Sequence, residues 1–355
     1  MDTQTLEKKT QNMKNYPKVA VVILNWNGKF FLEKFLPYVY NSTYPNIVFV
    51  VGDNGSTDNS IAFVQETYPS IKIIANDKNY GFAGGYNAIL AQVEADYYVL
   101  LNSDVEVTPN WIEPVIAYLE TEPGMVAAQP KILAYHDKQI FEYAGAAGGF
   151  IDALGYPFCR GRILQEVERD EQQYDDNREI FWATGAALFI RADVWRDAGG
   201  FDDDFFAHME EIDLCWRLKR MGHRVGYVAD STVYHVGGGT LKASNPKKTY
   251  LNFRNSLLMV QKNAGFFACW WIVFIRLWLD LVALIKFLID GKPRDAWAIS
   301  RAHQYFFLNI FRNAKKRKRF SVKENRTGLY KKSIIWDFYI HKIRQFSQLK
   351  NKNFF

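Results

Sequence analysis

The 355-residue chain has little of what marks several common protein classes. Its three cysteines, Cys159, Cys215 and Cys269, lie far apart and form no CxxC pair. This argues against a disulfide framework or a structural zinc site, and it fits a reducing, cytosolic setting. The lysines near the N-terminus are followed by no apolar core, so we expect residues 1–17 to be a flexible leader rather than a secretory signal.

Two nucleotide-binding signatures are also missing. The glycine-rich stretch that begins at Gly81 is not GxGxxG, and no acidic residue follows it at the spacing of dinucleotide-binding folds, which disfavours a nicotinamide cofactor. The sequence has no GxxxxGK[ST] loop either. This second absence argues against a P-loop kinase or NTPase.

Positive charge is scarce in most of the chain. The formal net charge is +6, yet residues 291–355 carry 17 Lys or Arg against 3 Asp or Glu, and residues 1–290 carry 27 against 35. The basic excess therefore belongs to the tail, and we predict no nucleic-acid partner for the protein as a whole.

Short apolar runs of strand length alternate with segments that carry apolar residues at helical spacing. The expected strands are 19–24, 47–51, 71–75 and 97–101, and the expected helices between them are 29–40, 59–68 and 84–94. This alternation predicts an α/β fold, with a Rossmann-like, mostly parallel sheet and helices on both of its faces.

Polar or glycine-rich clusters follow all four expected strands, which is where such a sheet places its ligand site. They are Asn25-Trp26-Asn27-Gly28, the segment DNGSTD at 53–58, the segment NYGFAGGYN at 79–87, and Asn102-Ser103-Asp104. Any one of them could be ordinary turn or cap chemistry. Four at one sheet edge predict a shared ligand site.

Individual side chains in these clusters suit a phosphorylated ligand. Asp53 follows an apolar strand and can accept hydrogen bonds from a base N–H or a ribose hydroxyl. The glycines of the third cluster allow close backbone approach, while Asn79 and Asn87 offer neutral hydrogen bonds. Asp104 ends a strand at the expected cleft, where a carboxylate can hold Mg²⁺ or Mn²⁺; a helix N-cap is the other interpretation.

A second acidic group lies at the start of a helix expected over about 209–221. The helix dipole favours Glu210, Glu211 and Asp213 at this end, and Asp213 can pair with Arg217 one turn later. Three acids within four residues exceed what capping requires. One of them could therefore serve as a general base, and the residues alone leave open which one.

Taken together, these segments resemble family 2 glycosyltransferases with the GT-A fold. The series is NWNG, DNGSTD, NYGFAGGYN and LNSD, then ATGAALFIR (183–191), GGFDDDFF (199–206) and EEIDLCWR (210–217). It is most similar to the rhamnosyltransferase-like branch that builds bacterial surface polysaccharides. The likeness covers about residues 18–263, with order and spacing intact.

The resemblance implies an inverting transferase that uses a nucleotide-diphosphate sugar. Asp104 corresponds to the metal-binding acid of the family's DxD-type motif, whose first acid is replaced by Asn102. The family's Glu-Asp pair reads Glu210-Glu211, which aligns the base with Glu211 and leaves Glu210 and Asp213 as candidates. The residues implied to bind the nucleotide sugar are Asn25, Asn27, Asp53, Asn79, Gly81, Asn87, Asn102, Ser103 and Arg254.

Three further assignments rest on the same resemblance, and each has an alternative. Trp182, Thr184 and Gly185 would form the acceptor side, unless Trp182 is a buried core residue. His235 would complete the metal shell or touch the diphosphate, unless it makes an ordinary loop hydrogen bond. Arg254 would contact the diphosphate, unless it forms a salt bridge on its helix.

The stretch 266–289 is apolar and long enough to cross a bilayer, but Arg276, Asp280 and Lys286 interrupt it. Its tryptophans and the basic segment 315–319 suit a helix that lies on a membrane surface or packs on the preceding domain. We therefore expect residues 264–355 to form a helical, basic extension. The protein should then be cytoplasmic and peripheral on the inner face of the cell membrane.

The sequence thus predicts a GT-A domain over residues 18–263. It would use Mg²⁺ or Mn²⁺ and move a sugar from a nucleotide-diphosphate donor to a hydroxyl of a saccharide or lipid-linked saccharide, in surface-polysaccharide synthesis. Two alternatives stay open: transfer to polyprenyl phosphate, and a non-catalytic relative that binds glycans or acts as a scaffold. Retention of Asp104 and of the three acids at 210–213 argues against the second.

Overall fold

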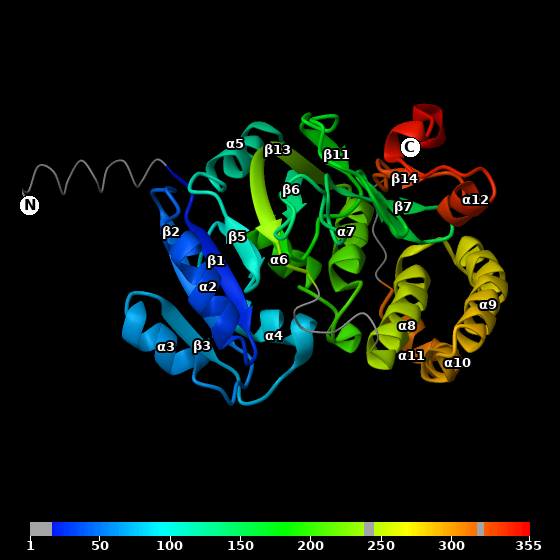
Figure 1. Cartoon of the computed structure of the whole chain (residues 1–355), viewed down its shortest axis with the longest axis horizontal. Helices are drawn as coiled ribbons and strands as arrows, with labels where there is room; N and C mark the ends of the chain where they lie inside the picture. The colour runs from blue at the N-terminus through cyan, green and yellow to red at the C-terminus, as the bar shows by residue number, and fades with distance from the viewer. Residues whose placement is uncertain (1–15, 238–244, 318–322) are drawn as a thin grey trace, which may run out of the picture.

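A mixed sheet of nine strands forms the centre of the protein (Figure 1). The computed structural model describes residues 16–237, 245–317 and 323–355, so the expected leader and part of the basic segment 315–319 lie outside the described residues. In spatial order the strands are β11 (Arg178–Ile180), β13 (Arg224–His235), β6 (Met125–Ala134), β12 (Ala187–Arg191), β4 (Tyr97–Asn102), β1 (Val19–Asn25), β2 (Ile47–Asp53) and β3 (Lys72–Ala75), with β5 (Val105–Val107) paired to β13.

The parallel half of the sheet confirms the predicted alternation. Strands β4, β1, β2 and β3 pair in parallel, and their register places Asn25 beside Asp53. Alternate residues of β1 face two separate hydrophobic cores, one on each side of the sheet, which explains why its apolar run is continuous. The helices of this half are α2 (Lys29–Tyr40), α3 (Ser60–Thr67), α4 (Gly81–Leu90) and α5 (Glu113–Thr121).

The other half of the sheet brings in antiparallel pairing. Strand β12 runs antiparallel to both β4 and β6, and β13 runs parallel to β6. The short strand β5 pairs antiparallel with the end of β13, so that His235 lies opposite Val105. Between β12 and β13 the chain forms α6 (Ala192–Ala198), a 3-10 turn η1 (Asp203–Phe205) and α7 (Glu210–Arg220).

A second, smaller sheet contains the last strand of the chain. Its strands in spatial order are β10 (Glu166–Val167), β9 (Arg162–Ile163), β8 (Pro157–Cys159), β7 (Gly149–Asp152) and β14 (Leu329–Tyr330). Strand β14 pairs in parallel with β7. Residues after it form α12 (Ile334–Tyr339), η2 (Phe346–Gln348) and η3 (Asn351–Asn353). The C-terminal part is therefore not helical throughout.

Aromatic contacts pack the segment after β14 against the small sheet. Phe346 lies 4.7 Å from Phe150 and 6.2 Å from Phe158 between ring centroids, and Phe354 lies 5.5 Å from Phe150. The backbone N–H of Phe346 also donates to the buried Glu168 carboxylate. Side chains nearly two hundred residues apart in sequence thus share one core.

A layer of helices, drawn yellow to orange in Figure 1, packs beside the two sheets. It consists of α8 (Pro246–Asn263), α9 (Phe266–Ile289), α10 (Pro293–Leu308) and α11 (Ile310–Lys315). On α9 the buried Arg276 donates to Ser256 of α8, and Asp280 lies 2.9 Å from His303 of α10. Arg276 and Asp280 of α9 therefore bond to neighbouring helices rather than to each other.

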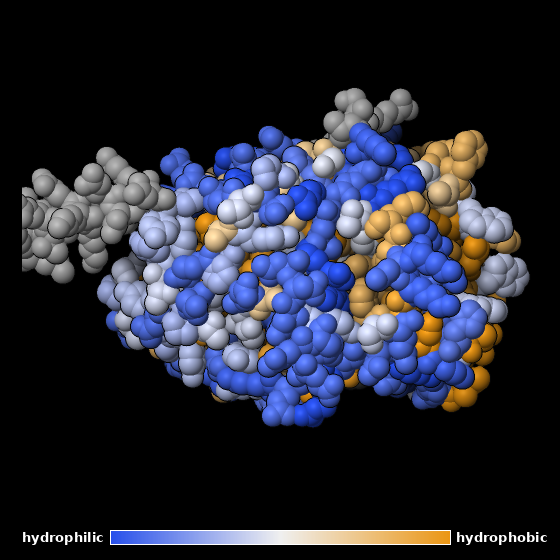
Figure 2. Space-filling view, turned by 90° about the horizontal axis from the view of Figure 1, so that it is seen from above, coloured by the Kyte–Doolittle hydropathy of each residue, from blue (hydrophilic) through white to orange (hydrophobic). Residues whose placement is uncertain are grey.

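The outward face of α9 is a stripe of exposed aromatic and aliphatic side chains. Its exposed members, spaced by three or four residues, are Phe267, Trp271, Phe274, Trp278, Val282, Ile285 and Ile289. Figure 2 shows apolar side chains gathered at the same end of the molecule. Within the described ranges, no helix is both long enough and apolar enough to span a bilayer.

Candidate active site

The carboxyl ends of β1 and β2 form the floor of the predicted site. Asn25 is fully buried, and its side-chain N–H groups donate to Asp53, Ser56 and Ser60. The other oxygen of Asp53 accepts the backbone N–H of Ser56. This network holds the Asp53 carboxylate at the end of its strand. A Cβ at Gly28 would lie 2.5 Å from the Asn25 side-chain oxygen, so the loop after β1 requires glycine there.

Asn54, which the sequence analysis did not select, connects the second and third clusters. Its amide N–H groups donate to Asn79 Oδ1 and to the carbonyl of Gly81, and its oxygen accepts from the backbone N–H of Tyr80. Asn79 also accepts from the N–H of Gly81. The side chains of Asn54 and Asn79 therefore shape the loop before α4.

Two asparagines predicted to bind the nucleotide sugar are occupied by loop contacts. Asn27 Oδ1 accepts the backbone N–H groups of Thr57 and Asp58, which joins the first and second clusters. Asn87 donates to the carbonyl of Phe201 and to Asp203, and it accepts from the N–H of Phe201. The structure thus gives Asn87 a supporting role for the loop before α7, which its position in a glycine-rich stretch did not reveal.

The end of β4 meets the end of β13 at the opposite side of this floor. Asp104 Oδ1 lies 3.2 Å from His235 Nε2, and the Asn102 side-chain nitrogen lies 3.4 Å from the same ring nitrogen. The backbone N–H of Val236 donates to the Asp104 carbonyl. Pairing of β5 with β13 therefore brings His235 to Asn102 and Asp104, from which it is far apart in sequence.

Glu142 is a further member of this group that sequence reasoning missed. Its Oε1 atom lies 3.4 Å from His235 Nδ1, while its Oε2 accepts the backbone N–H of Ala144. Burial acts to lower the pKa of His235, but the Asp104 and Glu142 carboxylates outweigh it and raise that pKa to about 10. A lone acid in an irregular segment gave no sequence signal, because only the fold places it beside the imidazole.

The loop before α7 is held in an unusual backbone conformation. Phe206, His208 and Met209 have φ values of 63°, 71° and 72°, which cost about 1–3 kcal/mol each for non-glycine residues. The Asn255 side chain of α8 offsets this by donating to the carbonyls of Phe205, Ala207 and His208. This loop fixes where α7 begins.

Arg254, next to Asn255, supports the same loop. Its guanidinium donates to the carbonyls of Asp204 and Phe205 and to the Asn255 side-chain oxygen. These contacts with backbone carbonyls are neither of the two that the sequence suggested for this arginine, a diphosphate contact or a helix salt bridge.

Glu210 and Glu211 open α7, and among the residues that the structure describes neither carboxylate has a cationic partner. The Oε2 atoms of both are buried and accept no hydrogen bond from the described residues. Burial raises the pKa of Glu211 to about 7, and burial together with the neighbouring Glu211 raises that of Glu210 well above its usual value. Glu211 Cβ also lies 3.9 Å from the position of a Cβ on Gly185.

Asp213, the third candidate base, forms buried ion pairs with Arg217 and Lys262. It is fully buried, and its two oxygens accept from Arg217, from Lys262 and from Asn263. Lys262 also donates to Asp202, which draws the loop before α7 into the same cluster. Despite the cost of burial, Lys262 and Arg217 lower the pKa of Asp213. With Arg217, Lys262 and Asn263 all donating to it, the Asp213 carboxylate accepts a proton less readily than that of Glu211.

The predicted acceptor-side residues separate into two groups. Trp182 is a core residue, because it is buried and its indole N–H donates to the carbonyl of Phe150. Thr184 is also buried, and its backbone N–H donates to Gln129. Gly185 packs against Phe82 and Glu211 and so lies beside the candidate base.

Two family models match the chain. Residues 20–175 match "Glycosyl transferase family 2", and residues 98–290 match "Glycosyl transferase family group 2". The second match covers more than half of the chain. This protein is a family 2 glycosyltransferase.

Comparisons with individual proteins agree with this family. The glycosyltransferase is 26% identical over 233 residues to an N-acetylglucosaminyl-diphospho-decaprenol L-rhamnosyltransferase of Mycobacterium tuberculosis, which is 61% of this chain and 75% of that protein. Its fold matches GalNAc-T7 with UDP, GalNAc and Mn²⁺ (TM-score 0.55, 17% identity, 70% of this chain and 48% of that one). It also matches the mannosyltransferase PcManGT from Pyrobaculum calidifontis with GDP-Man and Mn²⁺ (TM-score 0.51, 14% identity, 87% and 82%). These likenesses confirm the predicted GT-A fold.

In this glycosyltransferase, Asp104 and His235 have the chemistry of a divalent-cation site. A carboxylate oxygen and a deprotonated imidazole nitrogen are both ligands that Mn²⁺ accepts. A cation would therefore bind between Asp104 and His235, which lie 3.2 Å apart, by displacing the proton that the two carboxylates favour on the imidazole. Among the described residues, no three His, Cys, Asp or Glu side chains are grouped closely enough to hold a metal alone. Ions of this type commonly complete their shell with water and substrate phosphate, so two protein ligands fit a cation that arrives with a diphosphate.

Proposed function

We propose that the protein is an inverting, metal-dependent glycosyltransferase that moves a sugar from a nucleotide-diphosphate donor to a hydroxyl of a lipid-linked saccharide, in the synthesis of a cell-surface polysaccharide. The name of the mycobacterial relative, which includes a diphospho-decaprenol-linked sugar, supports this acceptor class. The observation that carries the proposed chemistry is the Glu211 carboxyl group, which has no cationic partner among the described residues, has a pKa near 7 and lies beside Gly185.

A pKa near the working pH suits a general base, because a useful fraction is ionised while the group keeps affinity for a proton. In the proposed step, Glu211 takes the proton of the acceptor hydroxyl as that oxygen attacks the anomeric carbon. The bond between this carbon and the donor's diphosphate oxygen breaks, and the nucleoside diphosphate leaves on the opposite face. One such displacement inverts the anomeric centre.

The donor would lie along the carboxyl edge of the parallel strands. Asp53 would accept hydrogen bonds from the nucleoside, and the diphosphate would then extend toward Asn102 and Asp104. Asp104 and His235 would hold Mg²⁺ or Mn²⁺, which supplies positive charge to a leaving diphosphate. Glu142 orients His235, as carboxylates commonly do for ligating imidazoles.

The donor side can be tested with Asp104→Asn. We expect metal-dependent release of nucleoside diphosphate to fall at least about 100-fold, because removal of partners further from a metal already costs 10- to 100-fold. The measurement is product release from a panel of nucleotide sugars, with titrated Mn²⁺ and Mg²⁺. Glu106→Gln, which removes a nearby acid that pairs with Lys138 outside the site, is the matched control. Equal metal dependence in Asp104→Asn and the unmodified protein would contradict the assignment.

The acceptor class can be settled in the same assay. Transfer to a saccharide on a lipid diphosphate is the expected result. Transfer to polyprenyl phosphate alone would establish the rival reaction, in which the donor half is unchanged. Donor binding without turnover on any acceptor would instead indicate a non-catalytic relative.

We also propose that the exposed stripe of α9 rests on a membrane surface. Trp271, Phe274 and Trp278 lie one helical turn apart and point away from the buried Arg276. Tryptophans at the interface and nearby basic residues are typical of helices that lie in the plane of a bilayer. A lipid-linked acceptor would be reached from this position.

Replacing Trp271, Phe274 and Trp278 together with Gln should weaken binding to anionic vesicles at least tenfold, since each large apolar side chain contributes roughly 1.5–3 kcal/mol when buried. Co-sedimentation with phosphatidylglycerol vesicles measures the effect. Phe30→Gln with Tyr38→Gln removes exposed aromatics from α2 and is the control. Undiminished sedimentation of the triple variant would refute the membrane-facing role of α9.

A further inference from the structure

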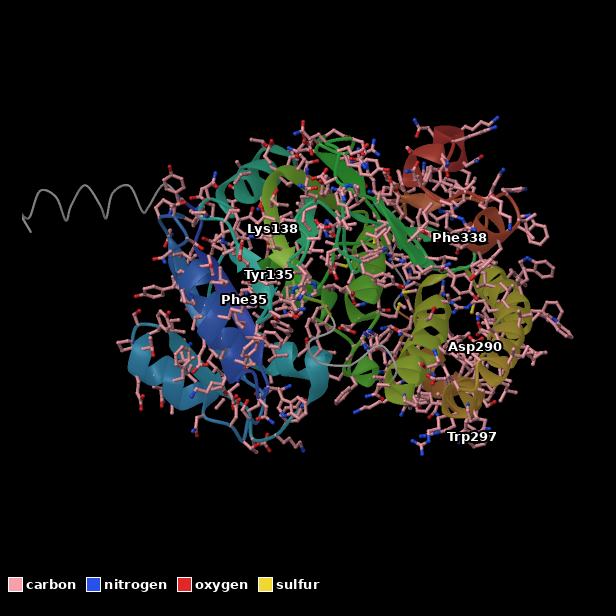
Figure 3. The ribbon with its side chains drawn as sticks, viewed as in Figure 1. Phe35, Tyr135, Lys138, Asp290, Trp297 and Phe338 are labelled. Atoms are coloured by element: carbon pink, nitrogen blue, oxygen red, sulfur yellow. The ribbon has the colours of Figure 1, made fainter. Side chains whose placement is uncertain are left out.

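A pocket of about 640 Å³ lies between α8 and α10, and it shares only Phe206 and Arg254 with the residues discussed so far. Its basic lining residues are Lys247 and Arg254 from the α8 side, and Arg294 and Arg301 from α10. Figure 3 labels Trp297 of the same lining at the edge of the molecule, where α8 and α10 pack side by side. None of the described side chains that line this pocket is acidic.

Three of these four basic side chains are exposed and form no ion pair with the described residues. Arg254 is engaged with loop carbonyls, but Lys247, Arg294 and Arg301 are exposed, and within the described part of the chain none of them forms an ion pair. Guanidinium groups bind phosphate oxygens through paired N–H donors and tolerate removal from water better than ammonium groups do. An anion with two phosphates matches this number and kind of donors.

Aromatic rings hold the cations in position. The Tyr250 ring lies 5.2 Å from the Arg301 guanidinium and 5.3 Å from that of Arg254, measured to the ring centroid. Lys247 lies over the Phe206 ring at 4.5 Å. Such contacts restrict the cations before a ligand arrives, which lowers the entropy lost on binding.

The pocket adjoins the loop that leads to the candidate base. Phe206 forms part of its wall, and the Phe206 carbonyl accepts the backbone N–H groups of Phe82 and Ala83 at the start of α4. Glu210 and Glu211 follow four and five residues later in the chain. Phe206 thus lies between the pocket and the cluster that begins at Asn79, because its ring and its carbonyl also lie against Gly81.

A second groove of about 540 Å³ lies between α9 and another face of α10. Six of its lining side chains are aliphatic or aromatic, and Asp280, Ser300, His303 and Gln304 complete the lining. Helix α10 thus contributes to both sites. A cationic pocket and a hydrocarbon-lined groove on one helix match the two ends of a lipid diphosphate.

We propose that the pocket between α8 and α10 binds the diphosphate of the lipid-linked acceptor, with the lipid chain directed along the α9–α10 groove. This inference rests on the proposed transfer to a lipid-linked saccharide and names the part of the protein that recognises its charge. Anchoring the diphosphate here leaves the attached sugar free to reach Glu211 around the Phe206 loop.

The first test compares steady-state kinetics of the full-length protein and the double variant Arg294→Ala/Arg301→Ala. With a saccharide linked to a polyprenyl diphosphate, we expect the acceptor KM to rise about 10- to 100-fold, since a hydrogen bond to a charged group contributes on the order of a tenfold factor. The donor KM and the slow release of nucleoside diphosphate without acceptor should not change. With the same saccharide on an uncharged alkyl chain, the two proteins should perform equally.

Lys292→Ala is the matched control, because it removes an exposed cation just before α10 that does not line the pocket. If the unmodified protein uses no lipid-linked acceptor at all, the proposed function fails. If it does and the double variant keeps the same acceptor KM, the pocket assignment alone is overturned. A rise in donor KM instead would show that the pocket serves the donor and would equally overturn the assignment.

Direct binding separates the possible sources of the phosphate. In EDTA, farnesyl diphosphate should quench Trp297 fluorescence, with the signal lost in Trp297→Phe and the affinity lowered at least tenfold in the double variant. Inorganic pyrophosphate should bind the same pocket more weakly, and farnesol should not depend on the arginines. Unchanged farnesyl diphosphate binding, with reduced binding to phosphatidylglycerol vesicles, would make this a membrane headgroup site and contradict the proposal.

Discussion

Substituting Glu211 with Gln is expected to lower kcat by about 10²- to 10⁴-fold while donor binding is retained. The amide keeps the shape and most of the packing beside Gly185 but cannot accept the hydroxyl proton. Transfer to a lipid-linked acceptor and donor binding by calorimetry are the two measurements. Glu210→Gln, one residue earlier in the first turn of the same helix, is the matched control and should lower kcat much less. Unchanged turnover in Glu211→Gln would remove it as the base.

The pH profile adds a second readout for the same residue. Because the base acts in its ionised form, kcat/KM should rise with pH as Glu211 loses its proton near pH 7. This limb should be absent from the residual activity of Glu211→Gln. A profile that rises near pH 4 instead would indicate a solvated carboxylate as the base.

Stability should change in the opposite direction to activity. The pKa of Glu211 is higher in the folded protein than in the unfolded chain, so the folded state binds more protons between about pH 4.5 and 7 and loses stability as the pH rises through that window. The Gln variant has no such loss. Its melting temperature should therefore equal or exceed that of the unmodified protein at pH 8, which distinguishes a lost base from a damaged fold.

Asp213→Asn is expected to destabilise the protein by roughly 3–5 kcal/mol, the usual cost of leaving buried charges without a partner. Asn is close to Asp in size, but Lys262 and Arg217 would remain buried beside a neutral group. The midpoint of urea unfolding measures the change. Asp197→Asn removes an exposed acid from α6 and should have almost no effect.

The stability that Asp213 contributes through its ion pairs with Lys262 and Arg217 should be lost in acid. The pKa of Asp213 is lowered in the folded state, so its contribution is complete above the pKa of the unfolded chain, near 4, and is lost as the pH falls further. The stability difference between the unmodified protein and Asp213→Asn should accordingly shrink below about pH 4. A difference that persists unchanged into strong acid would show that size and packing, not charge, explain the effect.

Local sequence signals predicted the parallel half of the sheet well. Continuous apolar runs recovered β1, β2 and β4, and helical spacing recovered α2, each to within two residues, because the strands are buried on both faces and the helix on one. The polar clusters at strand ends were brought together as expected, since parallel strands share one carboxyl edge. The pairing of Asp104 with His235 was anticipated from the family resemblance rather than from spacing.

Other features lie beyond such signals for identifiable reasons. Strands β9, β10 and β14 are two residues long, too short to show any period. Glu142 and Asn54 act through contacts that exist only once distant segments have met. Asp213 looked like a third candidate base, because nothing in its neighbourhood along the chain reveals that Lys262 and Asn263 approach it from another helix.

The pairing of β14 with β7 has a consequence for the order in which the molecule is completed. Until residue 330 has been synthesised, β7 presents an unpaired backbone edge, and the rings of Phe150 and Phe158 lack Phe346 and Phe354. Exposed edges and apolar surface of this kind promote aggregation of incomplete chains. A fragment that stops at Asn263 would therefore carry the reactive groups but an unfinished second sheet. A shortened form of this enzyme made for expression should therefore keep all residues through Phe355, so that the second sheet is complete.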